Sequence, residues 1–161
     1  MAFDAFLEID GVEGEATRDG FEKMIEIESF TFGAHNPTSI GSGGGAGSGK
    51  AQLSSFNVTK YTDSASPALF QACCSGKHFP NAKITFHKSG GDEPLPYLTY
   101  EFDKVFVESI NWGGASGGDD RPTEQLSLAF GKVEILYQPQ AEKGSAAGAV
   151  SASWDQMRVS P

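Results

Sequence analysis

The segment with the clearest potential for chemistry is a glycine-rich stretch that ends in lysine. Residues 44–50 match the pattern G-x4-G-K of a phosphate-binding loop, in which backbone amides and a lysine hold nucleotide phosphates. That loop also needs Ser or Thr at the next position and a helix directly after it. Here Ala51 follows, and residues 52–61 have the pattern of a strand. We therefore expect no nucleotide site, and we interpret the segment as a loop tip that becomes ordered against a partner.

Histidine and cysteine side chains could bind a metal or form a redox pair. His35, His78 and His87 fall in a loop, after a helix and on the polar face of a strand, and no two have the spacing of metal ligands. Cys73 and Cys74 are adjacent, which is too close for an unstrained disulfide. They lack the C-x-x-C spacing, so we interpret both as small buried residues on a helix. The sequence predicts neither a metal nor a cofactor.

Catalysis by a nucleophile would need a base beside it, and no such pair can be recognised in the sequence. The acidic pair Asp119 and Asp120 precedes Arg121 and Pro122, which is typical of a solvated turn. We therefore predict no catalytic residues and expect that the protein is not an enzyme.

Two long strands organise the rest of the sequence. In residues 97–112 apolar and polar side chains alternate up to Phe102, and from Val105 the apolar side chains occupy the opposite phase. Residues 125–137 change phase in the same way around Gly131. A change of phase inside a continuous strand requires a bulge or a bend. We predict that the two strands are neighbours and bend together at the corner of a barrel or orthogonal sandwich.

A third change of phase occurs within residues 21–33. Phe30 and Phe32 stand on the opposite phase from the isoleucines before them. If these phenylalanines enter the core, Ser29 and Thr31 point out of the far face. A strand with small hydroxyls on its outer face is half solvated or lines a wet channel.

The remaining elements are short. Strands are expected at 3–9, 52–61, 82–88 and around Trp154, with a polar loop at 11–20. Ser66 and Pro67 predict the start of a helix with Ser66 as its N-cap, and Gly76 predicts its end. Leu69, Phe70 and Cys73 would form its apolar stripe. The fold class is therefore mainly β: a β-barrel or orthogonal sandwich of two sheets with one short flanking α-helix, as a single domain over residues 1–161.

The charge and hydropathy of the sequence argue against some classes of binding partner. Twelve basic against 21 acidic residues give a net charge of −9, which argues against nucleic-acid binding. No apolar run approaches the ~20 residues of a membrane span, so we expect no membrane insertion. The first ten residues carry three acids and lack the basic region of a secretory leader. We expect a protein made and folded in the cytoplasm that leaves the cell, if it does, without a signal peptide.

A series of motifs, in order over nearly the whole chain, resembles the Hcp (haemolysin-coregulated protein) family, the inner-tube protein of the bacterial type VI secretion system. The motifs are FTFG at 30–33, the Gly-rich loop ending at 49–50, TKY at 59–61, SP at 66–67, CSGKH at 74–78, KSGG at 88–91, VFVES at 105–109, DRPTE at 120–124 and YQPQ at 137–140.

The resemblance implies a β-barrel that assembles as a hexameric ring. Rings stack into a tube inside a contractile sheath, contraction fires the tube with a spike at its tip, and the protein emerges outside the cell or in a target cell. Some members bind and protect small effectors in the lumen of the ring. The resemblance places Ser29 and Thr31 on the lumen-lining strand, in contact with effectors.

Two glycine-rich loops are the predicted contacts between stacked rings, because stacking needs mobile loops on the ring faces. The predicted ring-stacking residues are Gly41, Ser42, Gly43, Gly44, Gly45, Ala46, Gly47, Ser48, Gly49, Gly113, Gly114, Gly117 and Gly118.

Two alternatives stay open. A monomeric ligand-binding barrel without catalysis would need interior space and a few converging polar groups, whereas the inward-facing side chains here are large aromatics. An enzyme would need a nucleophile and base that the sequence does not show. Sedimentation of the purified protein separates the ring from both.

Overall fold

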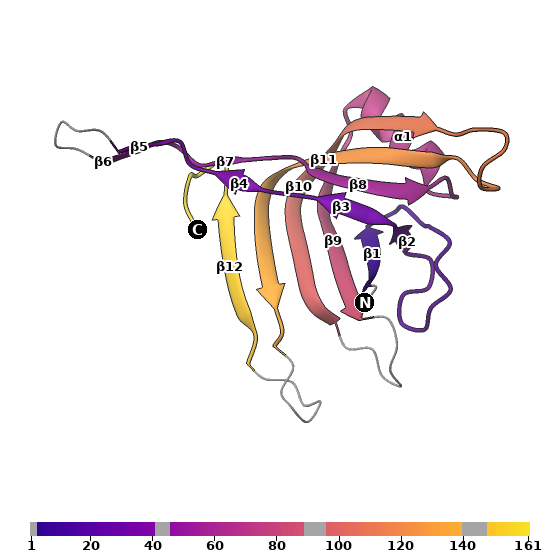
Figure 1. The fold of residues 1–161 in the computed structure, drawn as a ribbon, viewed down its shortest axis with the longest axis horizontal. Coiled ribbons are helices and arrows are strands. Elements are labelled where there is room, and N and C mark those ends of the chain that lie inside the picture. Colours follow the sequence, from indigo (N-terminus) through magenta and orange to yellow (C-terminus); the bar gives the residue numbers. More distant parts are fainter. Residues whose placement is uncertain (1–2, 41–45, 89–95, 140–147) are drawn as a thin grey trace.

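The computed structural model describes residues 3–40, 46–88, 96–139 and 148–161, and strands make up most of it (Figure 1). The elements in chain order are β1 Phe3–Ile9, β2 Ile25–Ile27, β3 Ser29–Thr31, β4 Ala34–His35, β5 Thr38–Ile40, β6 Ala46–Ser48, β7 Gln52–Leu53, β8 Phe56–Tyr61, α1 Ser66–Ser75, β9 His78–Lys88, β10 Pro96–Gly113, β11 Thr123–Tyr137 and β12 Val150–Asp155. The strand expected at 52–61 is divided into β7 and β8, and the strand expected at 82–88 begins earlier, at His78.

The main sheet curls into a nearly closed barrel. Its strand order is β2-β1-β9-β10-β11-β8-β3, with β12 paired to the second half of β11. Strands β2 and β3 follow each other directly, and the backbone N–H of Glu28 between them donates to the carbonyl of Thr59 in β8 at 2.8 Å. The two ends of the sheet therefore meet, and the predicted mainly β barrel is confirmed.

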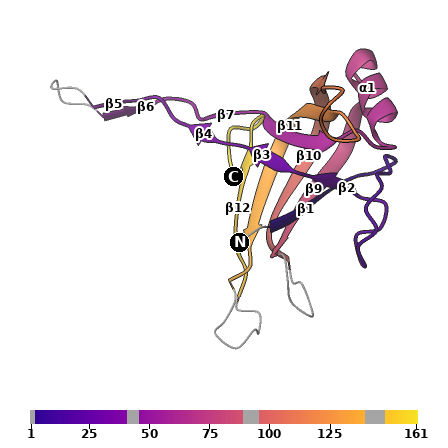
Figure 2. The ribbon, with the colours of Figure 1, turned by 45° about the vertical axis from the view of Figure 1, so that its right-hand side comes forward.

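A narrow arm leaves the barrel after β3. It consists of two short ladders, β4 with β7 and β5 with β6, and Figure 2 shows it projecting well beyond the body. Ile40 near its outer end is 91% exposed. A two-stranded ribbon with so little buried apolar surface is marginally stable alone.

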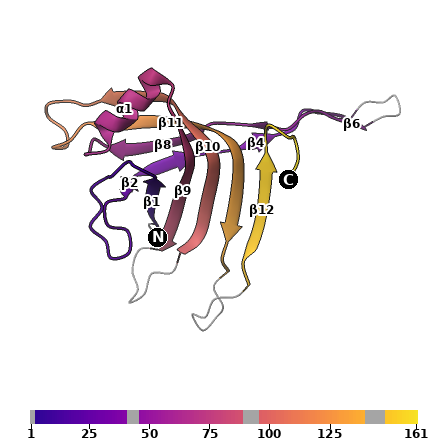
Figure 3. The same cartoon turned by 180° about the vertical axis from the view of Figure 1, so that it is seen from behind.

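The predicted corner is confirmed in both long strands. Burial passes from Phe102 to Val105 in β10 and from Phe130 to Val133 in β11, a step of three residues in place of two. Lys104 at the bend has a φ of 55°. Gly131 beside it is buried, and a Cβ there would lie 3.1 Å from the Met157 side chain. Figure 3 shows β10 and β11 curving together through this corner.

Aromatic rings fill the interior of the barrel. Phe56 is fully buried, and its ring centroid lies 5.2 Å from those of Tyr100 and Phe102 and 5.5 Å from those of Phe30 and Phe32. Burial raises the pKa of Tyr100. Each such ring buries about 150–250 Å². The packing argues against a ligand cavity at the centre of the barrel.

The flanking helix α1 differs from the expectation at its start. Its N-cap is Ala65, and the predicted cap Ser66 is the first helical residue. The Ser66 hydroxyl instead accepts a hydrogen bond from the backbone N–H of Asp63 at 3.0 Å. Pro67 lies in the first turn, and Gly76 ends the helix with a left-handed φ of 69°, as predicted.

The exposed face of α1 corrects the interpretation of the cysteines. Leu69 and Ala72 are buried, Cys73 is half-buried and Cys74 is exposed. The buried stripe follows the i, i+3 spacing from Leu69, which turns Phe70 and Cys74 toward solvent. The expectation of two buried cysteines was therefore wrong for Cys74, and Phe70 is not part of the core stripe.

The loop before β2 covers a second apolar layer outside the barrel. Phe6 on β1 is buried against Phe21, whose ring centroid lies 4.7 Å away. The ring of His87 is fully buried and lies 4.3 Å from Phe21. The expectation that His87 lies on a polar face was wrong, because this loop, with Val12 and Ala16 buried, covers that face of the sheet.

Candidate functional site

One face of the barrel wall carries a grid of uncharged polar side chains. Residues directly opposite each other on paired antiparallel strands share a face, so the strand registers place these side chains in two cross-strand rows. Across β3, β8, β11 and β10, the first row is Ser29, Thr59, Gln125 and Asn111, and the second row is Thr31, Asn57, Ser127 and Ser109. The name polar grid is used below for these eight residues.

The intervening row on the same four strands faces the core. Phe30 pairs with Val58, and Val58 pairs with Leu126. Val58 and Leu126 are buried, whereas Ser29 and Thr31 are exposed. The predicted orientation of Ser29 and Thr31 is therefore confirmed. Their contact with an effector stays a prediction.

All residues of the polar grid except Ser109 line a shallow depression of about 300 Å³. Within it, Ser127 Oγ donates to Asn57 Oδ1 at 2.5 Å, and Asn57 Nδ2 donates to the carbonyl of Ser55 at 3.2 Å. Hydroxyls and amides supply both donors and acceptors and carry no charge. Such a surface can form weak hydrogen bonds with many partners without selecting the sign of their charge.

The four-stranded face has two unpaired borders. In the described ranges, β3 pairs with β8 alone, and residues 107–113 of β10 pair with β11 alone. An unpaired strand presents free N–H and C=O groups that invite another strand. Because the two borders belong to different strands, a contact between them would be of the head-to-tail kind.

The two predicted stacking loops lie at opposite ends of the molecule. Figure 1 shows the arm extending from one end, while the segment between β10 and β11 forms the other end. Gly41–Gly45 lie outside the described residues. Ala46 and Ser48 belong to β6 and pair with Ile40 and Thr38 of β5.

The remaining glycines of these loops fall at tight places or in open space. A Cβ on Gly49 would lie 2.7 Å from the carbonyl oxygen of Pro37, so the arm requires glycine there. Gly114 faces Pro122 across the other loop, and Gly113 ends β10. Nothing lies within 4 Å of a Cβ built on Gly113 or Gly117. Their role in ring contacts stays a prediction.

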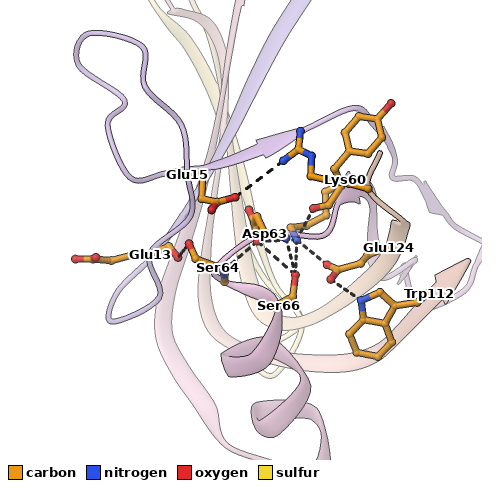
Figure 4. A network of polar contacts seen from close by, with 11 residues as sticks. Glu13, Glu15, Lys60, Asp63, Ser64, Ser66, Trp112 and Glu124 are labelled. Atoms are coloured by element: carbon orange, nitrogen blue, oxygen red, sulfur yellow. Dashed lines mark hydrogen bonds and ion pairs between the residues drawn. The ribbon is translucent and has the colours of Figure 1, made fainter. Parts of the chain in front are cut away.

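A buried polar network connects the barrel wall to helix α1 (Figure 4). The ammonium group of Lys60 is fully buried and donates to Glu124 Oε2 at 2.6 Å, to Asp63 Oδ1 at 3.0 Å and to the Ser66 hydroxyl at 3.2 Å. The other oxygen of Glu124 accepts from the indole N–H of Trp112 at 2.6 Å. The network thus joins β8, β11, the end of β10 and the start of α1.

Sequence reasoning missed this network, although the strand patterns contain its signal. Lys60 takes the inward phase after Phe56 and Val58, and Glu124 takes the inward phase before Leu126. Two opposite charges at inward positions of neighbouring strands indicate a buried ion pair.

A second set of contacts ties the loop after β10 to the wall. The Tyr61 hydroxyl donates to Asp119 Oδ2 at 3.1 Å, and this hydrogen bond raises the pKa of Tyr61. The Arg121 guanidinium lies over the Tyr61 ring, 5.1 Å from its centroid. Asp119, interpreted from the sequence as part of a solvated turn, is exposed and held by Tyr61.

The described residues show no arrangement suited to the other chemistry considered. Among them, no group of three or more His, Cys, Asp or Glu is placed to hold a metal ion. Strand β7, and not a helix, follows Lys50. Within the described part of the chain, no helix has the length and hydropathy needed to span a bilayer.

A comparison with known protein families shows to which family this chain belongs. Residues 6–137 match the family described as "Type VI secretion system effector, Hcp". The chain belongs to the Hcp family. It is also 39% identical over 156 residues to the protein named hcp1 of Pseudomonas aeruginosa, covering 96% of both chains.

Solved structures of the Hcp family share this fold. A protein described as a type six secretion system protein matches with a TM-score of 0.92 and 36% identity over 98% of both chains. Hcp1 from Salmonella typhimurium matches with a TM-score of 0.80 and 32% identity over 98% of this chain and 97% of that chain. The resemblance inferred from the motifs is therefore confirmed, and the family implies a role in type VI secretion.

Proposed function

We propose that this chain is the structural subunit of a type VI secretion tube, assembled as a homohexameric ring whose lumen is lined by the polar grid. The observation that carries this proposal is the uncharged, solvent-facing grid on a four-stranded wall with two unpaired borders. A wall of this kind is incomplete in one copy and becomes continuous when β3 of one copy lies beside β10 of the next.

The composition of the polar grid suits a conduit. It lacks the charged side chains that would hold a passing protein by strong ion pairs, and it lacks exposed apolar rings that would make it adhere. We infer that small effectors touch Ser29, Thr31 and their neighbours through weak hydrogen bonds, each worth about 1 kcal/mol net. Cargo is then retained by many contacts and released when the ring leaves its stack.

The proposal includes the partners and the route that the family relationship supports. Rings stack inside a contractile sheath behind a spike, and the whole chain acts as one domain over residues 1–161. It is assembled in the cytoplasm and leaves the cell through this apparatus. The protein acts by assembly and transport, without catalysis.

Sedimentation of the purified chain tests the ring. A species of six chains supports the proposal, whereas a chain that remains monomeric at high concentration contradicts it and favours a ligand-binding barrel. Negative-stain images of the six-chain species should show rings with an open centre. Compact particles without a central hole would also contradict the proposal.

A further inference from the structure

A β-bulge in β10 adds one residue beside the polar grid. Val107 pairs with Leu128 and Ser109 pairs with Ser127, so Glu108 stands between two paired positions without a paired residue of its own on β11. A residue inserted in this way interrupts the alternation of a strand and changes the direction of its side chain. Val107 is buried, whereas Glu108 is exposed. The bulge therefore adds a carboxylate next to Ser109, at the edge of the grid.

A hydrogen bond fixes the direction of this carboxylate. Oε2 of Glu108 accepts a hydrogen bond from the Ser55 hydroxyl. Ser55 comes directly before the buried Phe56 and two residues before Asn57 of the grid, so the alternation of the strand places Ser55 on the face that carries the grid. Strand β11 lies between β10 and β8. The side chain of Glu108 therefore extends across the wall toward β8, away from the unpaired border of β10.

The charge of Glu108 is not balanced by an ion pair. On β11, the residues opposite the bulged part of β10 include Ser127 and Ala129, whose small side chains leave the carboxylate room to cross the strand. The hydrogen bond between Ser55 and Glu108 lies at an exposed position. None of the ion pairs found among the described residues includes Glu108. A neutral donor thus holds an exposed carboxylate at the edge of an uncharged surface.

We propose that Glu108 sets the charge preference of the polar grid, so that the grid favours cargo segments that carry lysine or arginine. This inference rests on the proposed function and names the chemical class of cargo for the same surface. The eight residues of the polar grid are uncharged and cannot distinguish a cationic segment from an anionic one. A fixed carboxylate at their edge attracts an ammonium or guanidinium group and repels a carboxylate.

The contact is suited to cargo that must be released. The proposed ring repeats the carboxylate in each subunit, so a cationic segment meets one beside every copy of the grid. An exposed ion pair contributes little by itself, because water and salt screen it. Added to hydrogen bonds with the grid, such pairs select the charge of the cargo without holding it permanently.

Binding of peptides to assembled rings tests the preference. The probes are three fluorescein-labelled peptides of equal length, in which serine alternates with lysine, with glutamate or with glycine. Unmodified rings should bind the lysine peptide most tightly and the glutamate peptide least tightly, as measured by fluorescence anisotropy. In about 1 M salt this difference should disappear, because the Debye length falls to ~3 Å.

Glu108→Gln keeps the length of the side chain and an oxygen that can accept from Ser55. It should lower the affinity for the lysine peptide about fivefold and change that for the glycine peptide less than about twofold. Glu108→Lys should reverse the preference in favour of the glutamate peptide. Glu101→Gln is the matched control, since Glu101 lies on the same strand on the other side of the bend and its loss changes the net charge equally.

The control should bind all three peptides like the unmodified ring, and sedimentation should show six chains for every variant. Equal affinity of unmodified rings for the lysine and glutamate peptides would overturn the inference and leave the proposed function standing. Equal effects of Glu101→Gln and Glu108→Gln, or loss of rings in Glu108→Gln, would do the same. An unmodified chain that stays monomeric would instead contradict the proposed function, and the inference with it.

Discussion

Lys60 is the residue on which the wall and the helix both depend. Its ammonium group stands between two carboxylates inside the protein, with no exposed surface of its own. Removing one partner of a buried ion pair strands the other charge away from water, which costs far more than the net contribution of the intact pair. The residue is therefore a sensitive probe of the network.

We predict that Lys60→Met lowers the free energy of unfolding by about 3–5 kcal/mol, because the carboxylates of Glu124 and Asp63 lose their cation. Urea unfolding at a fixed chain concentration measures the change. Lys83→Met is the control, since Lys83 forms an exposed ion pair with Glu101 at 3.8 Å and should cost no more than ~1 kcal/mol. Equal stability of the two variants would show that the network contributes little.

Thr31 tests the polar grid as a cargo surface. Thr31→Gln adds a longer side chain on the exposed face of β3 and should leave the hexamer intact while lowering effector retention about fivefold, the equivalent of one hydrogen bond. Effector levels on co-expression measure the effect, with Thr17→Gln on an exposed loop as the control. Unaltered effector levels in Thr31→Gln would count against the lumen assignment.

For single residues, the direction of a side chain was easier to predict than the residue that it contacts. The outward direction of Ser29 and Thr31 follows from the alternation of β3, which is a local property. The alternation also places Lys60 and Glu124 at inward positions, but their contact depends on which strands are neighbours, and the sequence does not mark that pairing for residues 64 positions apart. The burial of His87 was missed for the same reason, since the loop that covers it is distant in sequence.

Among the elements, the arm stands apart because its ladders contact little of the barrel. Strand β5 is exposed at every position. A ribbon of this kind contributes little to the stability of a single chain. We propose that the arm contacts another copy.

We predict that deleting Gly41–Gly49 leaves rings intact and weakens their stacking, because the deletion removes β6 and its pairing with β5 and leaves the sheet pairing of the barrel unchanged. Electron microscopy of the shortened chain measures tube length and number. The thermal unfolding midpoint should match that of the full chain, which separates lost stacking from misfolding. Undiminished tube formation would contradict the assignment.

The corner and the arm show what a sequence reveals about elements. The bend in β10 and β11 was predictable, because a change of hydrophobic phase has few structural explanations. The ladders of the arm were not, because residues 34–53 lack the alternation of a half-buried strand when there is no core for them to face. The loop before β2 appeared polar for a related reason, since its buried apolar side chains, Val12 and Ala16, stand isolated among polar residues.

At the scale of the whole molecule, the barrel is nearly closed, while its four-stranded wall keeps, in the described ranges, two borders without a paired strand. The sheet returns on itself through Glu28, and aromatic rings fill its interior. The borders at β3 and at residues 107–113 nevertheless lack a second paired strand among the described residues. The measured number of chains in solution therefore decides between a self-sufficient barrel and a ring, as set out for sedimentation above.

The bend at Lys104 and Gly131 has a mechanical consequence. Strands β10 and β11 run continuously from the four-stranded wall into the layer that carries β12. The same two strands therefore belong to both layers of the molecule. A load applied to the polar grid reaches the opposite layer along covalent backbone rather than across side-chain packing. The two layers therefore cannot slide past each other. A thin-walled tube built from such subunits resists shear during ejection for this reason.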